Sequence, residues 1–139
     1  MDATYDFFDH TADLGIRVRA ATRPALIAPA GQALYAVIGE LAIAEPGATE
    51  SWNLTGDDAA VLLRDYLADL LFLFERDQRV IVAPDVSAFE DGGLRVDAAT
   101  VAIDPDRSVF FREVKAITYH ELAIRPIEGG FEATLIVDI

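Results

Sequence analysis

The sequence predicts an α+β protein in which two helices pack on a mostly antiparallel β-sheet, within a single compact domain of residues 1–139. The first observation is the order of the patterns, because strand, strand, helix, strand and helix are followed by a run of strands. The second is the length of 139 residues, which is typical of one domain. The third is the hydrophobic content of 53%, which is enough to build a core and excludes a mainly disordered chain.

The N-terminal residues predict two strands joined by a polar corner. Residues 5–8 form the first short strand. Residues 14–20 alternate apolar side chains with arginines, which indicates a strand that is buried on one face. Between them lie residues 9–13, with the sequence Asp-His-Thr-Ala-Asp.

A first helix is expected from Thr22, as N-cap, to about Gly39, with Pro24 in its first turn. Pro29 falls inside this range, so it should kink the helix or displace its start. Residues 24–44 are apolar over a length that could span a bilayer. Proline, glycine and polar residues interrupt the stretch, which favours a buried core helix over a membrane segment.

A turn is expected at residues 45–47 (Glu-Pro-Gly), followed by a short strand near residues 51–54. A second helix should then open with a capping-box pattern from Thr55 to Asp58. Its apolar residues recur at helical spacing and predict one buried stripe. The stripe consists of Leu63, Leu67, Leu70, Leu71 and Phe74.

The rest of the chain is expected to form strands separated by Gly-Gly turn signals at residues 92–93 and 129–130. The expected strands are residues 79–82, 94–103, 110–119, 122–126 and 131–138.

Charge and composition exclude several classes of function. The net charge of −13 argues against a surface that wraps nucleic acid, since phosphate binding requires clustered Lys and Arg. The absence of cysteine removes thiol nucleophiles, disulfides and Cys-zinc sites. No phosphate-binding loop and no nucleophile elbow is present. An acidic N-terminus without an apolar segment predicts no secretory signal, and we expect a cytoplasmic protein.

Three segments carry candidate functional residues. Asp9, His10 and Asp13 crowd into the first corner, where carboxylates suit hard divalent cations, although a hydrated turn explains the same residues. The last strand ends at Asp138 and Ile139. This places the Asp138 side-chain carboxylate close to the α-carboxylate of the chain, although an ordinary strand end is the simpler interpretation.

The third segment, residues 112–120, contains the only lysine of the chain, Lys115. If this segment is a strand, Glu113 and Lys115 share one face. They would form an ordinary surface ion pair or present charge to a partner.

These segments resemble one known family. Residues 5–16 (YDFFDHTADLGI) closely resemble the opening of archeases, and so do residues 113–120 (EVKAITYH) and 136–139 (IVDI). Residues 70–74 (LLFLF) resemble the second helix of that family. The resemblance covers residues 5–139 in the same order. One region departs from the family, because residues 23–31 contain two prolines and a glycine, so a late helix start near Ala30 is expected.

The resemblance implies a small α+β protein that assists the RtcB-type RNA ligase of tRNA splicing and is not itself an enzyme. Archeases promote guanylylation of the ligase and its multiple turnover, so RNA would be contacted only through the ligase. The family also carries a divalent-cation site, most often occupied by calcium in structures, while magnesium and manganese suit the same donors. Transferred by matching motif, the ligands are Asp13, Asp138 and a main-chain oxygen of Ile139. Asp9, His10, Glu113 and Lys115 would then support the site or face the partner.

Two alternatives belong to other classes. The first is a small metal-dependent phosphoesterase or nuclease that uses Asp9, Asp13 and Asp138, with Asp9 or His10 as general base. The second is a general protein chaperone, which would need a large exposed apolar patch. No oligomeric state is predicted.

Overall fold

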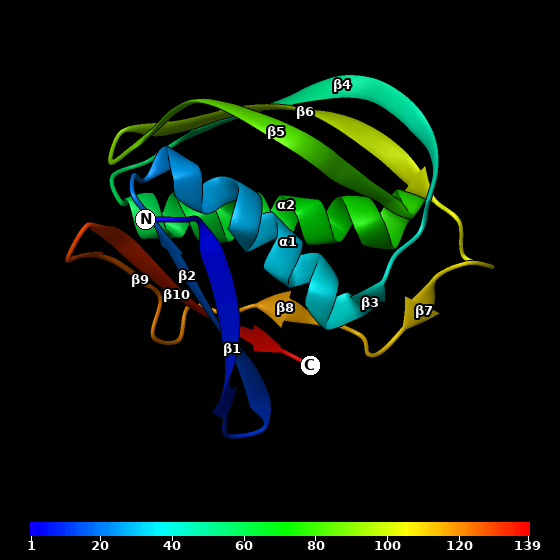
Figure 1. Ribbon diagram of the computed structural model, residues 1–139, viewed down its shortest axis with the longest axis horizontal. Helices are drawn as coiled ribbons and strands as arrows, with labels where there is room; N and C mark the ends of the chain where they lie inside the picture. The colour runs from blue at the N-terminus through cyan, green and yellow to red at the C-terminus, as the bar shows by residue number, and fades with distance from the viewer.

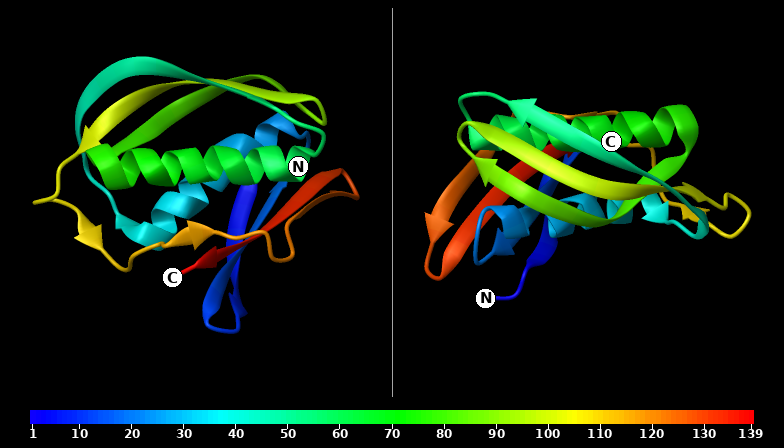
Figure 2. Two further views of the ribbon diagram at one scale, coloured as in Figure 1. Left: turned by 180° about the vertical axis from the view of Figure 1, so that it is seen from behind. Right: turned by 90° about the horizontal axis from the view of Figure 1, so that it is seen from above.

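The computed structural model describes residues 1–44 and 47–139, and its elements form three layers (Figure 1). A three-stranded sheet covers one side of the two helices, and a five-stranded sheet covers the other. Figure 2 shows the same layering from behind and from above. The predicted fold class, two helices with antiparallel sheets, is confirmed, but the strands divide into separate sheets instead of forming one.

The five-stranded sheet contains both ends of the chain. Its strands are β1 (Thr4–His10), β2 (Asp13–Ala20), β8 (Ala116–Ile117), β9 (Ala123–Ile127) and β10 (Gly130–Asp138). The order is β1-β2-β10-β8, and β9 pairs with the start of β10. The last strand therefore pairs with the second strand, and β1 forms the edge.

The opposite sheet has the order β4-β6-β5, with β4 (Ile43–Thr55), β5 (Arg79–Glu90) and β6 (Gly93–Ile103). Two of these strands are longer than expected, since the predicted ranges are 51–54 and 79–82. The predicted turn at residues 45–47 falls on Glu45 and Pro46, which lie outside the described residues. A small two-stranded sheet joins β3 (Gly39–Glu40) to β7 (Val109–Phe110).

Helix α1 (Ile27–Ile38) follows a single 3₁₀ turn, Pro24–Leu26. The N-cap of that turn is Arg23, one residue after the predicted Thr22, whose Oγ1 accepts a hydrogen bond from the N–H of Ala25 at 3.3 Å. Pro29 lies in the first turn of α1, where a missing N–H removes no helical hydrogen bond. The α-helix begins at Ile27, later than the predicted Thr22, and the expectation of a start near Ala30 is wrong. The predicted end is confirmed, with Gly39 as the C-cap.

Helix α2 (Ala59–Asp77) has the predicted apolar stripe, which is buried except for the half-buried Phe74 at its end. Its N-cap is Asp58, whose carboxylate accepts a hydrogen bond from the N–H of Ala60 at 2.9 Å. The prediction that Thr55 opens the helix is wrong, because β4 extends through Thr55 and the chain turns before the helix begins.

The segment 110–119 is predicted as one strand, and this prediction is wrong. It contains only the short strands β7 and β8, joined by residues 111–115. The N–H groups of Phe111 and Arg112 donate to the carbonyl of Ile38 at the end of α1, so they are not available for a sheet. Glu113 and Lys115 are exposed on this connection and do not share the face of a strand.

The core lies between the two sheets and surrounds the helices. Its fully buried members include Ile16 on β2, Leu34 on α1, Leu67 on α2 and Leu135 on β10. Within the described residues, neither helix is both long and apolar enough to cross a membrane.

Candidate metal centre

The two aspartates that the sequence singles out lie directly opposite each other. Asp13 is the first residue of β2, Asp138 is the last of β10, and the antiparallel register pairs their Cα atoms. Directly opposed residues project from the same face of a sheet, with Cβ atoms about 4.5–5.5 Å apart. Topology therefore brings together two carboxylates from opposite ends of the chain.

His10 lies on β1 directly beside Asp13, because the antiparallel register pairs the two residues. The β1–β2 turn is short, and Ala12 adopts a positive φ of 61° to close it. The Nδ1 atom of His10 lies 3.7 Å from an Asp13 oxygen, and its Nε2 lies 4.0 Å from Oε1 of Glu121. These distances exceed a hydrogen bond, and Nδ1 is buried without a partner among the described residues. The imidazole therefore lies between two carboxylates without a hydrogen bond to either.

The backbone beside Asp138 is fixed from the other side. The N–H of Lys115 donates to the carbonyl oxygen of Asp138 at 2.7 Å, just before β8 begins. This hydrogen bond attaches the segment that contains Glu113 and Lys115 to the end of β10. Ile139 directly follows Asp138, so its main-chain oxygens lie next to the end of β10.

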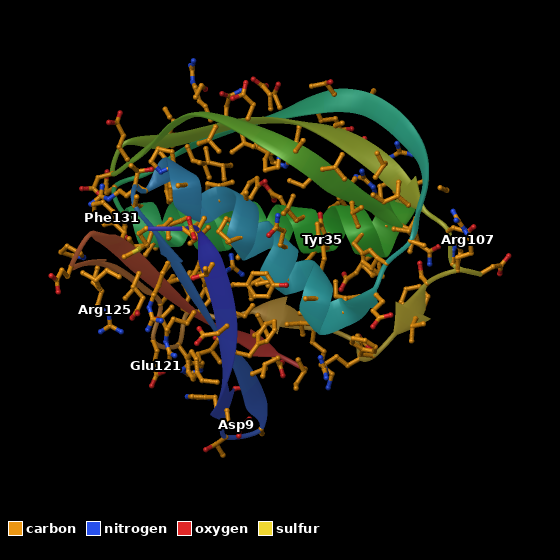
Figure 3. All side chains as sticks on the ribbon, viewed as in Figure 1. Asp9, Tyr35, Arg107, Glu121, Arg125 and Phe131 are labelled. Carbon is orange, nitrogen blue, oxygen red and sulfur yellow. The ribbon has the colours of Figure 1, made fainter. Side chains whose placement is uncertain are left out.

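Asp9 does not join this group. Its register partner is Leu14, so its side chain leaves the opposite face of the hairpin from that of His10. Figure 3 shows Asp9 at the tip of the β1–β2 hairpin, which projects beyond the body of the molecule. Glu113 also lies apart from the aspartates, at the rim of a groove beside α2.

The donor set fits a hard divalent cation. Two opposed carboxylates repel each other unless a cation lies between them. Carboxylate and main-chain oxygens are the ligands that Ca²⁺, Mg²⁺ and Mn²⁺ prefer. Among the described residues, no three His, Asp or Glu side chains gather closely enough to hold a metal by themselves. Main-chain oxygen, as from Ile139, or water would have to supply the remaining ligands of such a site.

Two further residues near this edge, Glu121 and Arg64, carry no signal in the sequence that would select them. Glu121 sits in the loop between β8 and β9, with a positive φ of 52°, and reaches toward His10. The guanidinium of Arg64, on α2, donates to the carbonyl of Ile117 at 2.9 Å and lies 4.4 Å from the ring centre of Tyr119. Only the three-dimensional fold brings these residues to the edge.

The far end of the same sheet holds a cluster of ion pairs. Glu132 is buried and accepts hydrogen bonds from Arg19 at 2.8 Å and Arg125 at 3.2 Å. Burial alone would raise the pKa of this carboxyl, but the hydrogen bonds and charges of the two arginines outweigh it and hold the pKa below its usual range. These ion pairs connect β2, β10 and β9. They are separate from the pair Asp13 and Asp138 at the other end of the sheet, which we call the acidic edge.

The fold and the acidic edge define a small α+β domain in which two opposed carboxylates end neighbouring strands of one sheet. The archease protein family (MTH1598/TM1083) matches residues 5–139, and the chain belongs to this family.

Individual relatives agree with this assignment. The protein archease of Methanopyrus kandleri is 33% identical over 138 residues, covering 97% of this chain and 99% of the relative. That of Pyrococcus furiosus is 31% identical over 139 residues, covering 97% and 98%.

Two solved structures share the fold. The solution structure of Methanobacterium thermoautotrophicum protein 1598 superposes with a TM-score of 0.75 at 24% identity, covering 97% of this chain and 98% of that one. A Thermotoga maritima crystal structure, described as "an archease, possible chaperone", gives a TM-score of 0.68 at 14% identity, covering 95% and 94%.

Proposed function

We propose that this protein is a non-enzymatic activator of an RtcB-type RNA ligase in tRNA splicing, which promotes guanylylation of the ligase and its multiple turnover in the cytoplasm. The observation that carries the proposal is the opposition of Asp13 and Asp138 in a chain of the archease family. A divalent cation, with calcium as the first candidate, would be held by Asp13, Asp138 and a main-chain oxygen of Ile139. Once bound, it would supply a concentrated positive charge that attracts anionic oxygens.

The neighbouring residues have supporting roles in this proposal. The Lys115 N–H keeps the Asp138 backbone in register, and His10 lies beside Asp13, with Glu121 on the far side of its imidazole. The acidic surface, with a net charge of −13, favours approach to a basic, RNA-binding enzyme.

The test is a guanylylation and ligation assay with the ligase of the same organism, with and without catalytic amounts of this protein. We expect stimulation from a few turnovers to many, and its loss in Asp13→Ala and Asp138→Ala. Asp85→Asn on β5, an exposed acid of the other sheet, is the matched control and should stimulate fully. Full stimulation by both folded site variants would refute the site.

Cation binding has its own readout. Adding calcium to chelator-treated protein should raise the melting temperature of the wild type but not of either site variant, because a ligand stabilises only the state that binds it. An extension after Ile139 should weaken the calorimetric affinity for calcium, and an unchanged affinity would exclude Ile139 as a ligand.

The two alternatives make different predictions. A phosphoesterase would hydrolyse a generic phosphoester without the ligase, but Asp9 leaves the face that carries Asp13, so the cluster that this activity requires is incomplete. A general chaperone would protect an unrelated aggregating protein. Neither result is expected.

A further inference from the structure

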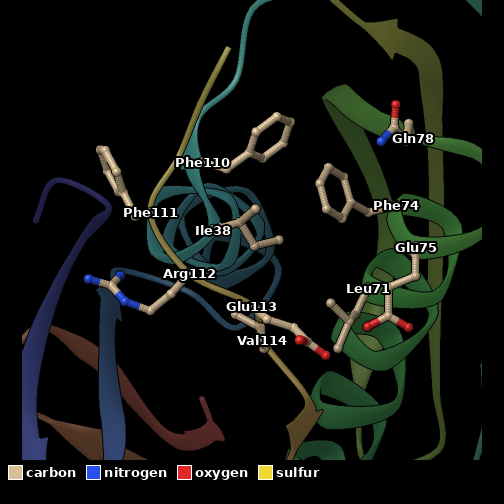
Figure 4. A pocket seen from close by; sticks show the side chains of 10 residues that line it. All are labelled: Ile38, Leu71, Phe74, Glu75, Gln78, Phe110, Phe111, Arg112, Glu113 and Val114. Carbon is tan, nitrogen blue, oxygen red and sulfur yellow. The ribbon is translucent and has the colours of Figure 1, made fainter. Parts of the chain in front are cut away.

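An open groove of about 510 Å³ lies between the C-terminal half of α2 and the segment that follows β7 (Figure 4). Phe74 of α2 and Phe110 of β7 stand on its two sides, with ring centres 6.5 Å apart and ring planes tilted by 48°. Ile38, Leu71 and Val114 complete an apolar lining. Apolar surface that stays open to water in a folded protein marks an interaction site more often than a random position does.

Two exposed aromatic residues stand next to each other on one wall of this groove. Phe110 is 47% exposed and its neighbour Phe111 is 50% exposed. Aromatic side chains contribute large contact area at low entropic cost, so they are common anchors in protein interfaces. The groove therefore has the composition of a protein-binding surface.

The wall that carries Phe110 is already fixed. The N–H of Phe111 donates to the carbonyl of Ile38 at 2.8 Å, and the guanidinium of Arg112 donates to the carbonyl of Val37 at 2.7 Å. Gly39 lets β7 approach, because a Cβ at this position would collide with the main-chain oxygen of Val109. A preformed groove of this kind binds without a large conformational cost.

The charge at the groove indicates what it binds. The carboxylates of Glu75 and Glu113 lie at the same end, as Figure 4 shows. Neither forms an ion pair with the described residues. The guanidinium of Arg112 points away from the groove toward α1. The available charge is thus negative and complements a Lys or Arg.

We propose that this groove docks a segment of the ligase in which an aromatic or branched aliphatic side chain is followed closely by a Lys or Arg. The apolar side chain packs against Phe74 and Phe110, and the basic group lies between Glu75 and Glu113. This inference rests on the proposed function. It adds a second contact, which the backbone links to the end of β10, because the Lys115 N–H that donates to the Asp138 carbonyl follows Glu113 by two residues.

The experiment measures the affinity of the full-length protein for the ligase by calorimetry. Phe110→Ala and the double variant Glu75→Gln/Glu113→Gln should each weaken binding by about tenfold, as expected for an interface anchor and its charge partner. Phe72→Ala is the matched control, since Phe72 is another exposed phenylalanine (58% exposed), lies on α2, and does not line the groove. It should bind within about twofold of the wild type, as do most peripheral residues.

Wild-type affinity in both groove variants would overturn the docking site. If, in that case, the wild-type protein still stimulates the ligase and Asp13→Ala abolishes the stimulation, only the docking groove is refuted and the proposed function stands. If the wild-type protein neither binds nor stimulates the ligase, the proposed function fails and the docking proposal fails with it. Glu75 and Glu113 are both exposed, so the variant Glu75→Gln/Glu113→Gln should fold. It therefore tests the groove even if Phe110→Ala does not fold.

A photo-crosslinking residue at position 110 identifies the occupant directly. A crosslink to the ligase, absent when the same residue is at position 72, supports the proposal. A crosslink between two copies of this chain would make a second copy the occupant and would overturn it.

Discussion

At the scale of single residues, two tyrosines of the interior differ in whether the hydroxyl has a partner. The Tyr35 hydroxyl accepts a hydrogen bond from the N–H of Ile81 at 3.0 Å, whereas the Tyr66 hydroxyl is buried without a partner among the described residues. Burial raises the pKa of Tyr35 to about 12, against a smaller lowering by the Ile81 hydrogen bond. Burial, together with the nearby Tyr35, also raises the pKa of Tyr66. Both residues remain neutral at physiological pH.

Removing each hydroxyl should therefore change stability in opposite directions. Tyr66→Phe should raise the free energy of unfolding by about 1 kcal/mol, because it removes an unsatisfied buried polar group. Tyr35→Phe should lower it by about 1–2 kcal/mol, because it leaves the buried Ile81 N–H without an acceptor. Urea denaturation of both variants measures the difference, and a change of the same sign in the two would contradict this account.

Glu132 provides a prediction about pH. Its pKa is lowered in the folded protein, so the unfolded chain binds a proton more readily than the folded protein. The stabilisation is therefore present above the ordinary glutamate pKa of about 4.3 and is lost as the pH falls through the lower folded-state value. We expect the melting temperature of Glu132→Gln to lie below that of the wild type at pH 7. The difference in melting temperature should shrink as the pH falls toward about 3.

The control for this experiment is Glu90→Gln, an exposed acid at the end of β5. It should melt close to the wild type at both pH values. If the difference in melting temperature between Glu132→Gln and the wild type stayed constant with pH, packing and not the two arginines would account for the stabilisation by Glu132.

At the scale of elements, α2 depends on its N-terminal cap. The carboxylate of Asp58 satisfies the N–H of Ala60, one of the donors that the first turn leaves free. Asp58→Ala should cost about 1 kcal/mol of stability, as is typical for loss of an aspartate cap. Asp57→Ala, one residue before the N-cap, should change stability by less than about 0.5 kcal/mol. Equal losses in the two variants, measured by urea denaturation, would assign the effect to charge near the helix dipole.

Elements with a periodic pattern could be predicted from the sequence, and those defined by distant partners could not. The apolar stripe of α2 predicts its buried face because helical spacing alone decides which side chains face the core. Residues 111–115 have the composition of a strand, but the end of α1 takes up the N–H groups of the first two. The sequence likewise indicates that Thr55 can cap a helix, but pairing of β4 with β6 keeps Thr55 in a strand.

The candidate site was predictable for a similar reason, but only in part. Asp13 and Asp138 each stand at the end of an apolar segment, so the sequence marks both as strand ends. Their meeting depends on β10 pairing with β2, which no local pattern specifies. Glu121 enters only because the loop after β8 turns back toward the first hairpin. The family resemblance implied that Asp13 and Asp138 share one site, but it did not specify which strands pair.

At the scale of the whole molecule, 24 acidic residues against 11 basic ones make self-repulsion a general property of the folded chain. Screening reduces this repulsion, and the Debye length shrinks from about 10 Å at 0.1 M salt to about 3 Å at 1 M. Raising the concentration of a monovalent salt should therefore raise the melting temperature.

The same screening weakens attraction to a basic partner, so the association rate with the ligase should fall by about tenfold or more. Stopped-flow association and thermal melts over one salt series measure both effects. If salt slowed association but left the melting temperature unchanged, the excess acid would act in partner attraction without straining the fold, whereas a salt-independent rate would remove the electrostatic contribution to docking.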